Sequence, residues 1–279
     1  MRTEMIQVNT CRPFEGNPFR VRDDAEMEML TDSIREYGVM VPIMVRPLGY
    51  DCFEVVSGHR RLHACVKAGI ETVPAFIREM SRDEAVICMV DSNLHREGLL
   101  PSEKAFAYKI KLEAMKHQGR TSGQLVQKWT RDEVAVSESG RTVQRYIRLT
   151  NLEKPLLELV DQGRIALTPA VELSYLLPEE QQAIIQTFET DEITPSYSQA
   201  VRMRKLSELG LLSMDKVFEI MTEVKGNQKE YLKLAAERYE PYLGRFTTPR
   251  DKEDFIMKAL DYYTKYLERQ RAARDWDAR

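Results

Sequence analysis

The spacing of apolar residues changes near residue 100, and this change constrains the fold more than any other feature of the sequence. Before it, short β-prone runs alternate with amphipathic stretches that have the period of a helix. The β-prone runs are 39–47, 53–57 and 72–79. After it, strand signals nearly vanish and helical patterns continue to the last residue. The alternation predicts an α/β type of domain over residues 1–100, and the helical patterns predict an all-α domain over residues 101–190 and a helical C-terminal region over residues 199–279.

Membrane-spanning and disulfide-rich proteins are both disfavoured by the sequence. No apolar run approaches the roughly 20 residues that a spanning helix needs, and the first residues, MRTEMIQVNTCRPF, lack the apolar segment of a secretory signal. Cys11, Cys52, Cys65 and Cys88 are scattered without a CxxC motif, which indicates free thiols and neither a disulfide framework nor a zinc site. We therefore expect a cytoplasmic protein without a membrane partner.

The net charge of −3 hides an uneven distribution of charges. Residues 101–150 hold ten Lys and Arg residues against five acidic ones, whereas the segments on both sides are acidic. A local basic segment in an acidic chain is a better sign of nucleic-acid binding than the overall charge. A solvated helical face would give the same count, so the charge alone leaves both interpretations open.

The stretch SGHRRLHACVKAG, residues 57–69, marks a junction between a predicted strand and a predicted helix. Glycine at such a junction lets the backbone approach a bound group, and the first helical turn offers unpaired N–H donors and the positive end of the helix dipole. Arg60 and Arg61 add fork-shaped donors that suit phosphate oxygens. Gly58, Arg60 and Arg61 are therefore candidate phosphate ligands, although a glycine turn with two surface arginines fits the same residues.

A second candidate anion-binding turn lies between two predicted helices, in the stretch DSNLHREGLLP over residues 91–101. The Asn93 side chain can ligate a metal or bridge to a phosphate, and Arg96 adds positive charge. A helix-capping Asn followed by a solvated Arg is the simpler interpretation of the same residues.

Residues 131–152 fit a helix-turn-helix. Residues 131–135 supply a first helix, 136–138 a turn, and Ser139 caps a second helix in which Val143 and Ile147 face the core. The outer side of that helix carries side chains suited to the major groove. The candidate DNA-binding residues are Ser139, Arg141, Thr142, Gln144, Arg145 and Arg148, and we expect Arg141, Thr142 and Arg145 to make the base contacts. Helices with exposed arginines also occur in proteins that never touch DNA.

Together, the two turns and their surroundings resemble the ParB partition-protein family. That family carries G-E-R-R-x-x-A, then E-N-x-Q-R, then a proline-led helix. This sequence has Gly58, Arg60, Arg61 and Ala64 in the first motif, Asn93 and Arg96 in the second, and Pro101, Glu103, Ala105 and Tyr108 after it. Upstream, residues 17–21 and 33–46 resemble the family's N-P element and its G-x-x-x-P-I-x-V-R strand. The likeness runs from about residue 6 to residue 177.

The resemblance implies an α+β, ParB/sulfiredoxin-like nucleotide-binding domain over residues 1–100, followed by an all-α helix-turn-helix domain. It implies CTP and Mg²⁺ as cofactors, with Asn93 reaching the metal through the nucleotide. The implied triphosphate ligands are Gly58, His59, Arg60, Arg61, Asn93 and Arg96, and the implied base contacts are Arg20, Pro42 and Ile43. Double-stranded DNA, a ParA-type Walker ATPase and a second copy of the chain are the implied partners. Members of the family usually form dimers through the C-terminal segment, and the apolar stripe of Ile256, Leu260, Tyr263 and Leu267 is a candidate for this contact. Packing of the same stripe onto neighbouring residues of its own chain stays open as an alternative.

The resulting hypothesis is a centromere-binding partition protein that forms a CTP-gated clamp in the segregation of a plasmid, a mobile element or a chromosome. A ParB-like transcriptional regulator has the same architecture and stays open as an alternative. A sulfiredoxin-like nucleotide-using enzyme is a second alternative. It is disfavoured because such enzymes place a Cys in a G-C-H-R turn, where this chain reads Ser57-Gly58-His59-Arg60.

Two carboxylates of the family motifs are replaced in this chain. His59 stands in place of the first-motif Glu and Ser92 in place of the second-motif Glu. A neutral imidazole and a hydroxyl are poorer Mg²⁺ ligands than a carboxylate oxygen. We therefore expect CTP to be bound and to be hydrolysed slowly or not at all.

Overall fold

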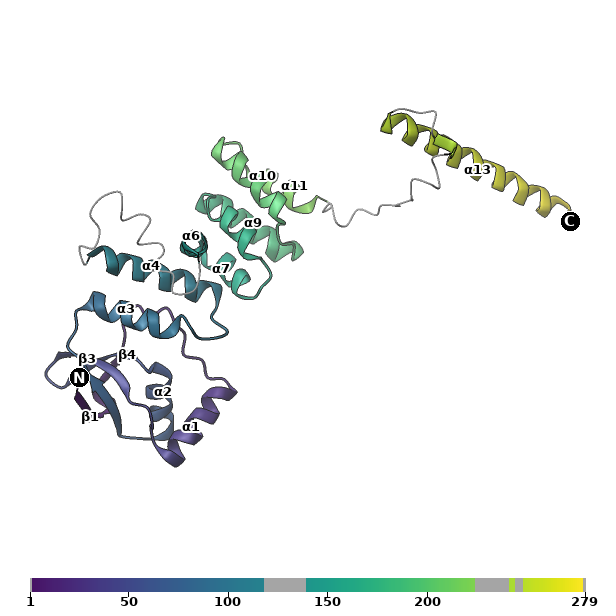
Figure 1. Cartoon of the computed structure of the whole chain (residues 1–279). Coiled ribbons are helices and arrows are strands. Elements are labelled where there is room, and N and C mark those ends of the chain that lie inside the picture. Colours follow the sequence, from purple (N-terminus) through teal and green to yellow (C-terminus); the bar gives the residue numbers. More distant parts are fainter. Residues whose placement is uncertain (1, 118–138, 224–240, 244–247, 278–279) are drawn as a thin grey trace. The chain divides into compact units, whose positions relative to one another are not determined.

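The computed structural model describes residues 2–117, 139–223, 241–243 and 248–277. The chain divides into two compact units, residues 1–223 and residues 224–279 (Figure 1). Residues 131–138, expected as the first helix and the turn of a helix-turn-helix, lie outside the described part. Among the described helices, none combines the length and the apolar character that crossing a membrane requires.

Five described strands form a mixed sheet in the N-terminal part of the first unit. Their order is β1-β5-β3-β4-β2, and their bounds are β1 Arg2–Gln7, β2 Cys11–Pro13, β3 Ile43–Gly49, β4 Cys52–Ser57 and β5 Thr72–Ile77. The β1–β5 and β3–β4 pairs are antiparallel, whereas the β3–β5 and β2–β4 pairs are parallel. Together with the helices that accompany it, this sheet confirms the predicted α+β class of the N-terminal part.

Three helices accompany the sheet, and capping residues mark where two of them begin. These helices are α1 (Ala25–Tyr37), α2 (His59–Ala68) and α3 (Arg82–Asn93), and a short 3₁₀ turn, η1 (Val8–Thr10), joins β1 to β2. Asp24 caps α1 with its side chain, and Ser81 caps α3 within a capping box. Apolar residues of α1 and α2 pack with the sheet in one buried cluster that includes Met27, Ile34, Cys65, Ile43, Val45 and Val55.

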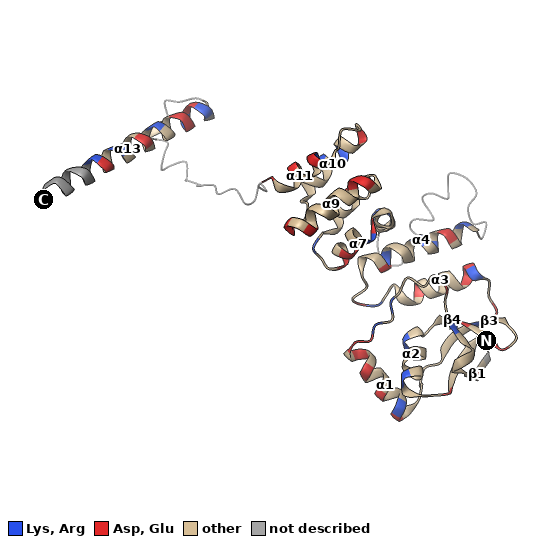
Figure 2. Ribbon diagram, turned by 180° about the vertical axis from the view of Figure 1, so that it is seen from behind, with Lys and Arg blue, Asp and Glu red and all other residues tan. Residues whose placement is uncertain are grey.

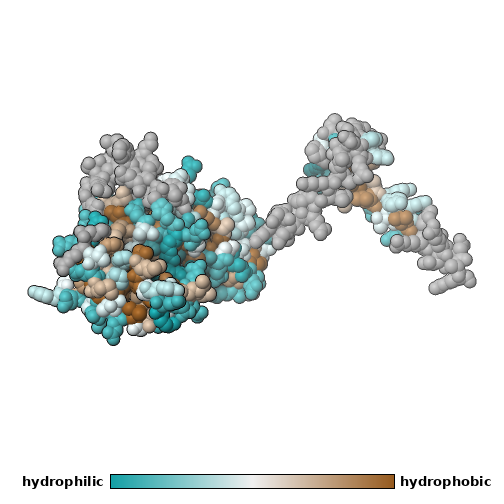
Figure 3. Space-filling model, turned by 60° about the horizontal axis from the view of Figure 1, so that its bottom comes forward, coloured by the Kyte–Doolittle hydropathy of each residue, from teal (hydrophilic) through white to brown (hydrophobic). Residues whose placement is uncertain are grey.

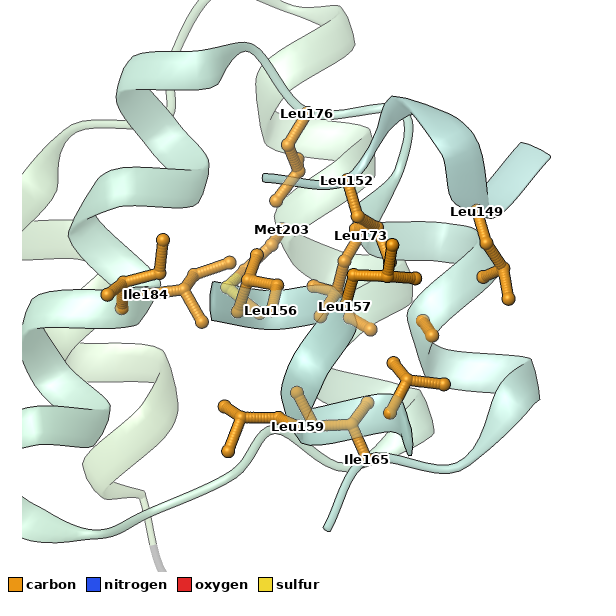
Figure 4. Packing of buried hydrophobic residues seen from close by; sticks show 14 of the residues in the cluster. Leu149, Leu152, Leu156, Leu157, Leu159, Ile165, Leu173, Leu176, Ile184 and Met203 are labelled. Atoms are coloured by element: carbon orange, nitrogen blue, oxygen red, sulfur yellow. The ribbon is translucent and has the colours of Figure 1, made fainter. Parts of the chain in front are cut away.

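The rest of the first unit is helical in its described residues. The helices are α4 (Pro101–His117), α6 (Gly140–Arg148), α7 (Lys154–Asp161), α8 (Leu167–Leu173), α9 (Pro178–Asp191), α10 (Tyr197–Glu208) and α11 (Met214–Thr222), with a 3₁₀ turn η2 (Leu149–Asn151) after α6. Helix α4 packs against α3 and also against α6 and α7, so it joins the sheet part to the helical part (Figure 1). Leu156, Leu173, Ile184 and Met203 belong to the core of the helical part (Figure 4).

The boundary of the first unit lies further along the chain than the sequence suggested. Helices α10 and α11 pack against α8 and α9, so residues 197–222 lie with the first unit. The boundary expected between residues 190 and 199 falls inside this unit, and the finer division into domains stays a prediction.

The second unit contains the long helix α13 (Pro249–Asp277). The apolar stripe expected there is exposed at Ile256, Leu260, Tyr263 and Leu267. On the visible face in Figure 3, apolar residues form small patches among hydrophilic ones in both units. The dimer contact expected in this region stays a prediction.

Candidate functional site

The two candidate anion-binding turns meet at one pocket in the first unit. Its lining comes from the loop 17–21, from the β4–α2 turn 57–61 and from the segment 92–96 at the end of α3. The charged lining residues are Arg20, Arg60, Arg61 and Arg96. None of the described lining residues carries a carboxylate. The pocket is therefore cationic and suits an anion.

Gly58 shapes the point where β4 passes into α2. Its backbone is left-handed, with φ 100° and ψ 23°, a conformation that favours glycine. A Cβ built on Gly58 would lie 2.7 Å from Ile43 Cγ2, which leaves no room for a side chain. The Leu62 N–H donates to the Gly58 carbonyl at 3.0 Å, so the N–H groups of residues 59–61 precede the first helical hydrogen bond. These N–H groups and the helix dipole add positive potential to the pocket wall.

The two adjacent arginines are held in different ways. Arg61 Nη1 donates to the Pro42 carbonyl at 2.6 Å, and burial lowers the pKa of the Arg61 guanidinium. Arg60 Nη2 lies 3.3 Å from Glu26 Oε2 and 3.5 Å from Asp24 Oδ1, at the acidic start of α1 (Figure 2). Because Glu26 is exposed, its contact with Arg60 is one that a phosphate can replace at low cost.

His59 lines the pocket as a neutral side chain that the protein itself anchors. The Phe14 N–H donates to His59 Nε2 at 3.4 Å, and the ring also hydrogen-bonds the backbone of Val55. Burial lowers the pKa of His59 to about 4, although the Glu54 carboxylate and the Val55 backbone act in the opposite direction. The imidazole is uncharged at pH 7, and its ring nitrogens are engaged by protein groups.

Asn93 and Arg96 contact each other at the end of α3. Arg96 Nη1 donates to Asn93 Oδ1 at 3.4 Å, and Asn93 Nδ2 donates to the Met89 carbonyl at 2.8 Å. The Ser92 hydroxyl donates to the same carbonyl at 2.9 Å. The amide nitrogen of Asn93 is thus committed to the backbone, which leaves its oxygen for Arg96 or for a cation.

The oxygen donors of the pocket lining determine what kind of metal it suits. They are neutral, and include the side-chain oxygens of Ser92 and Asn93. Proteins usually hold Mg²⁺ through one or two carboxylates together with phosphate oxygens and water. The described residues contain no group of three or more His, Cys, Asp or Glu side chains suited to a metal ion. The lining therefore fits a triphosphate that brings its own Mg²⁺, which Asn93 would help to hold, and does not fit a metal held by the protein alone.

The structure separates the three residues expected near the base. Arg20 lines the pocket, whereas Pro42 and Ile43 are not among the described lining residues. Ile43 is fully buried against Gly58, and the Pro42 carbonyl is occupied by Arg61. Pro42 and Ile43 thus support the turn through backbone and packing contacts.

Two buried carboxylates hold the loop that carries Arg20. Glu103 Oε1 accepts from the Arg20 N–H at 2.8 Å, and Asp161 Oδ2 lies 3.7 Å from Arg20 Nη2. Asp161 also accepts from the Ser102 N–H at 2.9 Å and from the Ser102 hydroxyl at 2.6 Å. These bonds tie the pocket to α4 and α7. The place of Glu103 in the first turn of a proline-led helix could have indicated a capping role, whereas nothing in the sequence marks Asp161.

Helix α6 carries the residues expected to read DNA. Ser139 caps it, since the Thr142 N–H donates to Ser139 Oγ at 3.3 Å. Val143 is buried, as the spacing predicted, Arg141 is exposed and Gln144 is half-buried. The N-terminal end of α6 therefore presents Arg141 and Thr142.

The two later arginines of α6 are tied to α8 and to the turn that follows it. Arg145 Nη2 donates to Thr168 Oγ1 at 2.6 Å, and Arg148 Nη2 donates to the Ser174 carbonyl at 3.1 Å. The Arg148 guanidinium also lies 3.8 Å from the centroid of the Tyr175 ring. These contacts give Arg145 and Arg148 a structural role in addition to the predicted one.

Comparison with known proteins identifies the N-terminal part. Residues 1–94 match the family model of the ParB N-terminal domain. The chromosome-partitioning protein Spo0J of Thermus thermophilus is 32% identical over 63% of this chain and 61% of its own length. The probable chromosome 1-partitioning protein ParB of Deinococcus radiodurans is 37% identical over 55% of this chain and 49% of its own length. The matched region thus spans about half to three fifths of these relatives.

Among solved structures, the C-terminally truncated ParB of Caulobacter crescentus complexed with CTP-gamma-S is similar to this chain. It is 25% identical, with a TM-score of 0.33, and the match covers 62% of this chain and 92% of that one. A TM-score this low does not establish a shared arrangement of the whole chain. The family model and the curated relatives agree: residues 1–94 match a ParB N-terminal domain, and the chain is similar to chromosome-partitioning proteins named ParB and Spo0J.

Proposed function

We propose that this protein is a sequence-specific DNA-binding partition protein that forms a CTP-gated clamp. The observation that carries the proposal is the meeting of the Gly58 turn and the Asn93 turn at one cationic pocket. Chromosome-partitioning proteins among the relatives support the role in DNA segregation. Segregation of a plasmid, a mobile element or a chromosome is compatible with the same chemistry.

The pocket chemistry favours a polyphosphate. Arg60, Arg61 and Arg96 supply forked donors from two turns, and the N–H groups that open α2 supply backbone donors. Bound Mg²⁺ would supply charge neutralisation between phosphate oxygens. Arg20, held by Glu103, is the lining residue that we assign to the far end of the nucleotide.

Hydrolysis of the bound CTP is slow or absent in this proposal. A water molecule that attacks a phosphate needs a group that orients it and takes up its proton. Here the ring nitrogens of His59 are engaged by Phe14 and Val55, and the Ser92 hydroxyl donates to the Met89 carbonyl. The nucleotide therefore acts as a ligand that stabilises one state of the protein.

The proposed DNA contact lies on α6. We assign base reading to Arg141 and Thr142, with Gln144 and Arg145 beside them, and phosphate contacts or support to Ser139 and Arg148. The basic segment 101–150 adds attraction to the phosphate backbone, so binding should weaken steeply with salt. The proposed partners are double-stranded DNA, a ParA-type Walker ATPase and a second copy of the chain.

A ParB-like regulator is the second candidate function. The nucleoid occlusion protein of Listeria monocytogenes is 30% identical over 66% of this chain and 61% of its own length. A protein of this kind would share the pocket and the DNA-reading helix. The sulfiredoxin-like enzyme is disfavoured further, because Cys65 is buried and burial raises the pKa of its thiol.

The test is nucleotide binding by the full chain, measured calorimetrically with CTP, ATP and GTP, with and without DNA. We expect CTP to bind best, DNA to raise its affinity, and phosphate release to stay near background. Arg96→Ala should remove binding, while Arg35→Ala should not, because Arg35 is exposed and pairs with Asp32 on α1. Absence of CTP binding, or rapid phosphate release, would refute the proposal.

A further inference from the structure

Tyr175 lies between two arginines that come from different helices. The guanidinium carbon of Arg148, the last residue of α6, lies 3.8 Å from the centroid of the Tyr175 ring. The guanidinium carbon of Arg204, in α10, lies 3.7 Å from the same centroid. Two guanidinium groups this close to one centroid occupy opposite faces of the ring, since they would overlap on one face. The ring therefore joins α6 to α10.

The two arginines differ in how their charges are balanced. Arg204 pairs with Glu172 at 3.0 Å and with Glu208 at 2.8 Å. Arg148 donates to the Ser174 carbonyl, and its buried Nε makes no hydrogen bond to the described residues. A partly desolvated cation that pairs with no carboxylate of the described residues gains from the negative face of an aromatic ring. The Tyr175 ring is therefore a main group that holds Arg148.

The stack fixes one end of α6 while leaving the other end accessible. Arg148 ends the helix, and Arg145, one turn earlier, donates to Thr168 at the start of α8. Arg141 and Thr142 lie in the first turn, away from these attachments. A small tilt of α6 at its clamped end would displace the first turn relative to a bound duplex.

We propose that Tyr175 is a positioning residue for DNA reading, which acts by clamping Arg148 and so sets the placement of α6. This inference rests on the proposed DNA-binding function. Tyr175 reads no base in this scheme, and its loss lowers the preference for the cognate sequence more than the general affinity for DNA.

The fold is expected to survive loss of the ring. Tyr175 is 42% exposed and lies outside the buried cluster of the helical part. That cluster is formed by residues such as Leu149, Leu156 and Leu173, which are fully buried. Removing the ring therefore removes two cation–π contacts and leaves the core packing in place.

The experiment compares Tyr175→Leu with Tyr175→Phe in the full chain. The probes are a duplex enriched by the wild-type protein from a random-sequence library and a shuffled duplex of the same length and composition. Tyr175→Leu should weaken binding of the enriched duplex by about fivefold to tenfold, and binding of the shuffled duplex by less than about twofold. Tyr175→Phe keeps the ring and should behave like the wild type. Arg204→Gln, which leaves Arg148 on the ring, should show a smaller loss of preference.

Two results would overturn the inference. One is an equal loss on both duplexes, which would make Tyr175 a residue of general stability or affinity. The other is wild-type preference in Tyr175→Leu. Circular dichroism and urea unfolding, measured on the same samples, verify that each variant is folded. If the wild-type protein enriches no duplex, the proposed function fails together with this inference. If it does enrich a duplex and Tyr175→Leu gives either of the two results above, this inference alone fails.

Discussion

The proposed nucleotide pocket and the proposed DNA-reading helix α6 are held in place by different kinds of contact. At the pocket, a left-handed Gly58, a neutral His59 and a backbone-bound Arg61 fix the geometry through contacts inside the domain. On α6, Arg141 is exposed, and Arg145 and Arg148 are held by side chains and a carbonyl of a neighbouring segment. The shape of the pocket therefore depends on the local backbone, whereas the placement of α6 depends on how the helices pack.

Substitution of Gly58 tests the preformed pocket and should give the largest effect. Gly58→Ala forces a Cβ to within 2.7 Å of Ile43 Cγ2 in a left-handed conformation, so we expect a loss of about 2–4 kcal/mol in the free energy of unfolding. CTP binding should be lost as well. Gly69→Ala is the matched control, because Gly69 is also left-handed but has open space around it. Urea unfolding of both variants measures the difference, and equal losses would show that the close approach to Ile43 is unimportant.

The pH dependence of stability tests the neutral state of His59. The pKa of His59 is about 4 in the folded protein and near 6.5 when unfolded, so the unfolded state binds more protons between these values. Stability should therefore fall as the pH drops from 6.5 to 4, by about 2–3 kcal/mol from this group. His59→Gln should flatten that part of the profile. A profile unaffected by His59→Gln would contradict the buried neutral state.

Much of the pocket could be predicted from the sequence, because the signals for its turn, helices and strands come from residues close together in the chain. The Gly58 turn, the caps of α1 and α3, and the strands β3, β4 and β5 follow from glycine, capping residues and β-prone runs near in sequence. Strands β1 and β2 were not predicted: both lie at sheet edges, and β2 has only three residues. The strand expected from residue 39 begins at Ile43, and the preceding Pro42 has no N–H to give to a ladder.

Contacts between residues far apart in the chain could not be predicted from the sequence. Asp161 reaches Arg20 and Ser102 from another helix, and Tyr175 meets Arg148 and Arg204 only because three helices pack together. His59 occupies a motif position, yet its partner Phe14 is 45 residues away in sequence and comes close only because β2 pairs with β4. Such pairings depend on the tertiary fold, which local patterns do not specify.

Substitution of Asp161 tests whether the pocket is independent of the helical part. Asp161→Asn keeps one acceptor but loses the charge that binds Ser102 and Arg20, so we expect a loss of about 1–2 kcal/mol in the free energy of unfolding. CTP affinity should fall by about twofold to fivefold, because the Arg20 loop loosens. Glu158→Gln, on the same helix, is the control, since its pair with Lys154 is exposed and worth little. Unchanged CTP affinity in a destabilised Asp161→Asn variant would show that the pocket does not depend on the helical part.

Substitution of Arg141 tests the reading surface and should change stability least of all. Arg141 is exposed, so Arg141→Ala should leave the free energy of unfolding within about 0.5 kcal/mol of the wild type. Its effect belongs to recognition: preference at one base position should relax by about tenfold, because a forked contact to a base edge is lost. The salt dependence of binding to shuffled DNA should stay close to that of the wild type, since a base contact neutralises no phosphate. Arg202→Ala, which removes an exposed arginine of α10 paired with Glu223, should leave base preference intact. A uniform loss across all sequences in Arg141→Ala would move Arg141 from base reading to phosphate binding, and α6 would then dock on DNA through its charge alone.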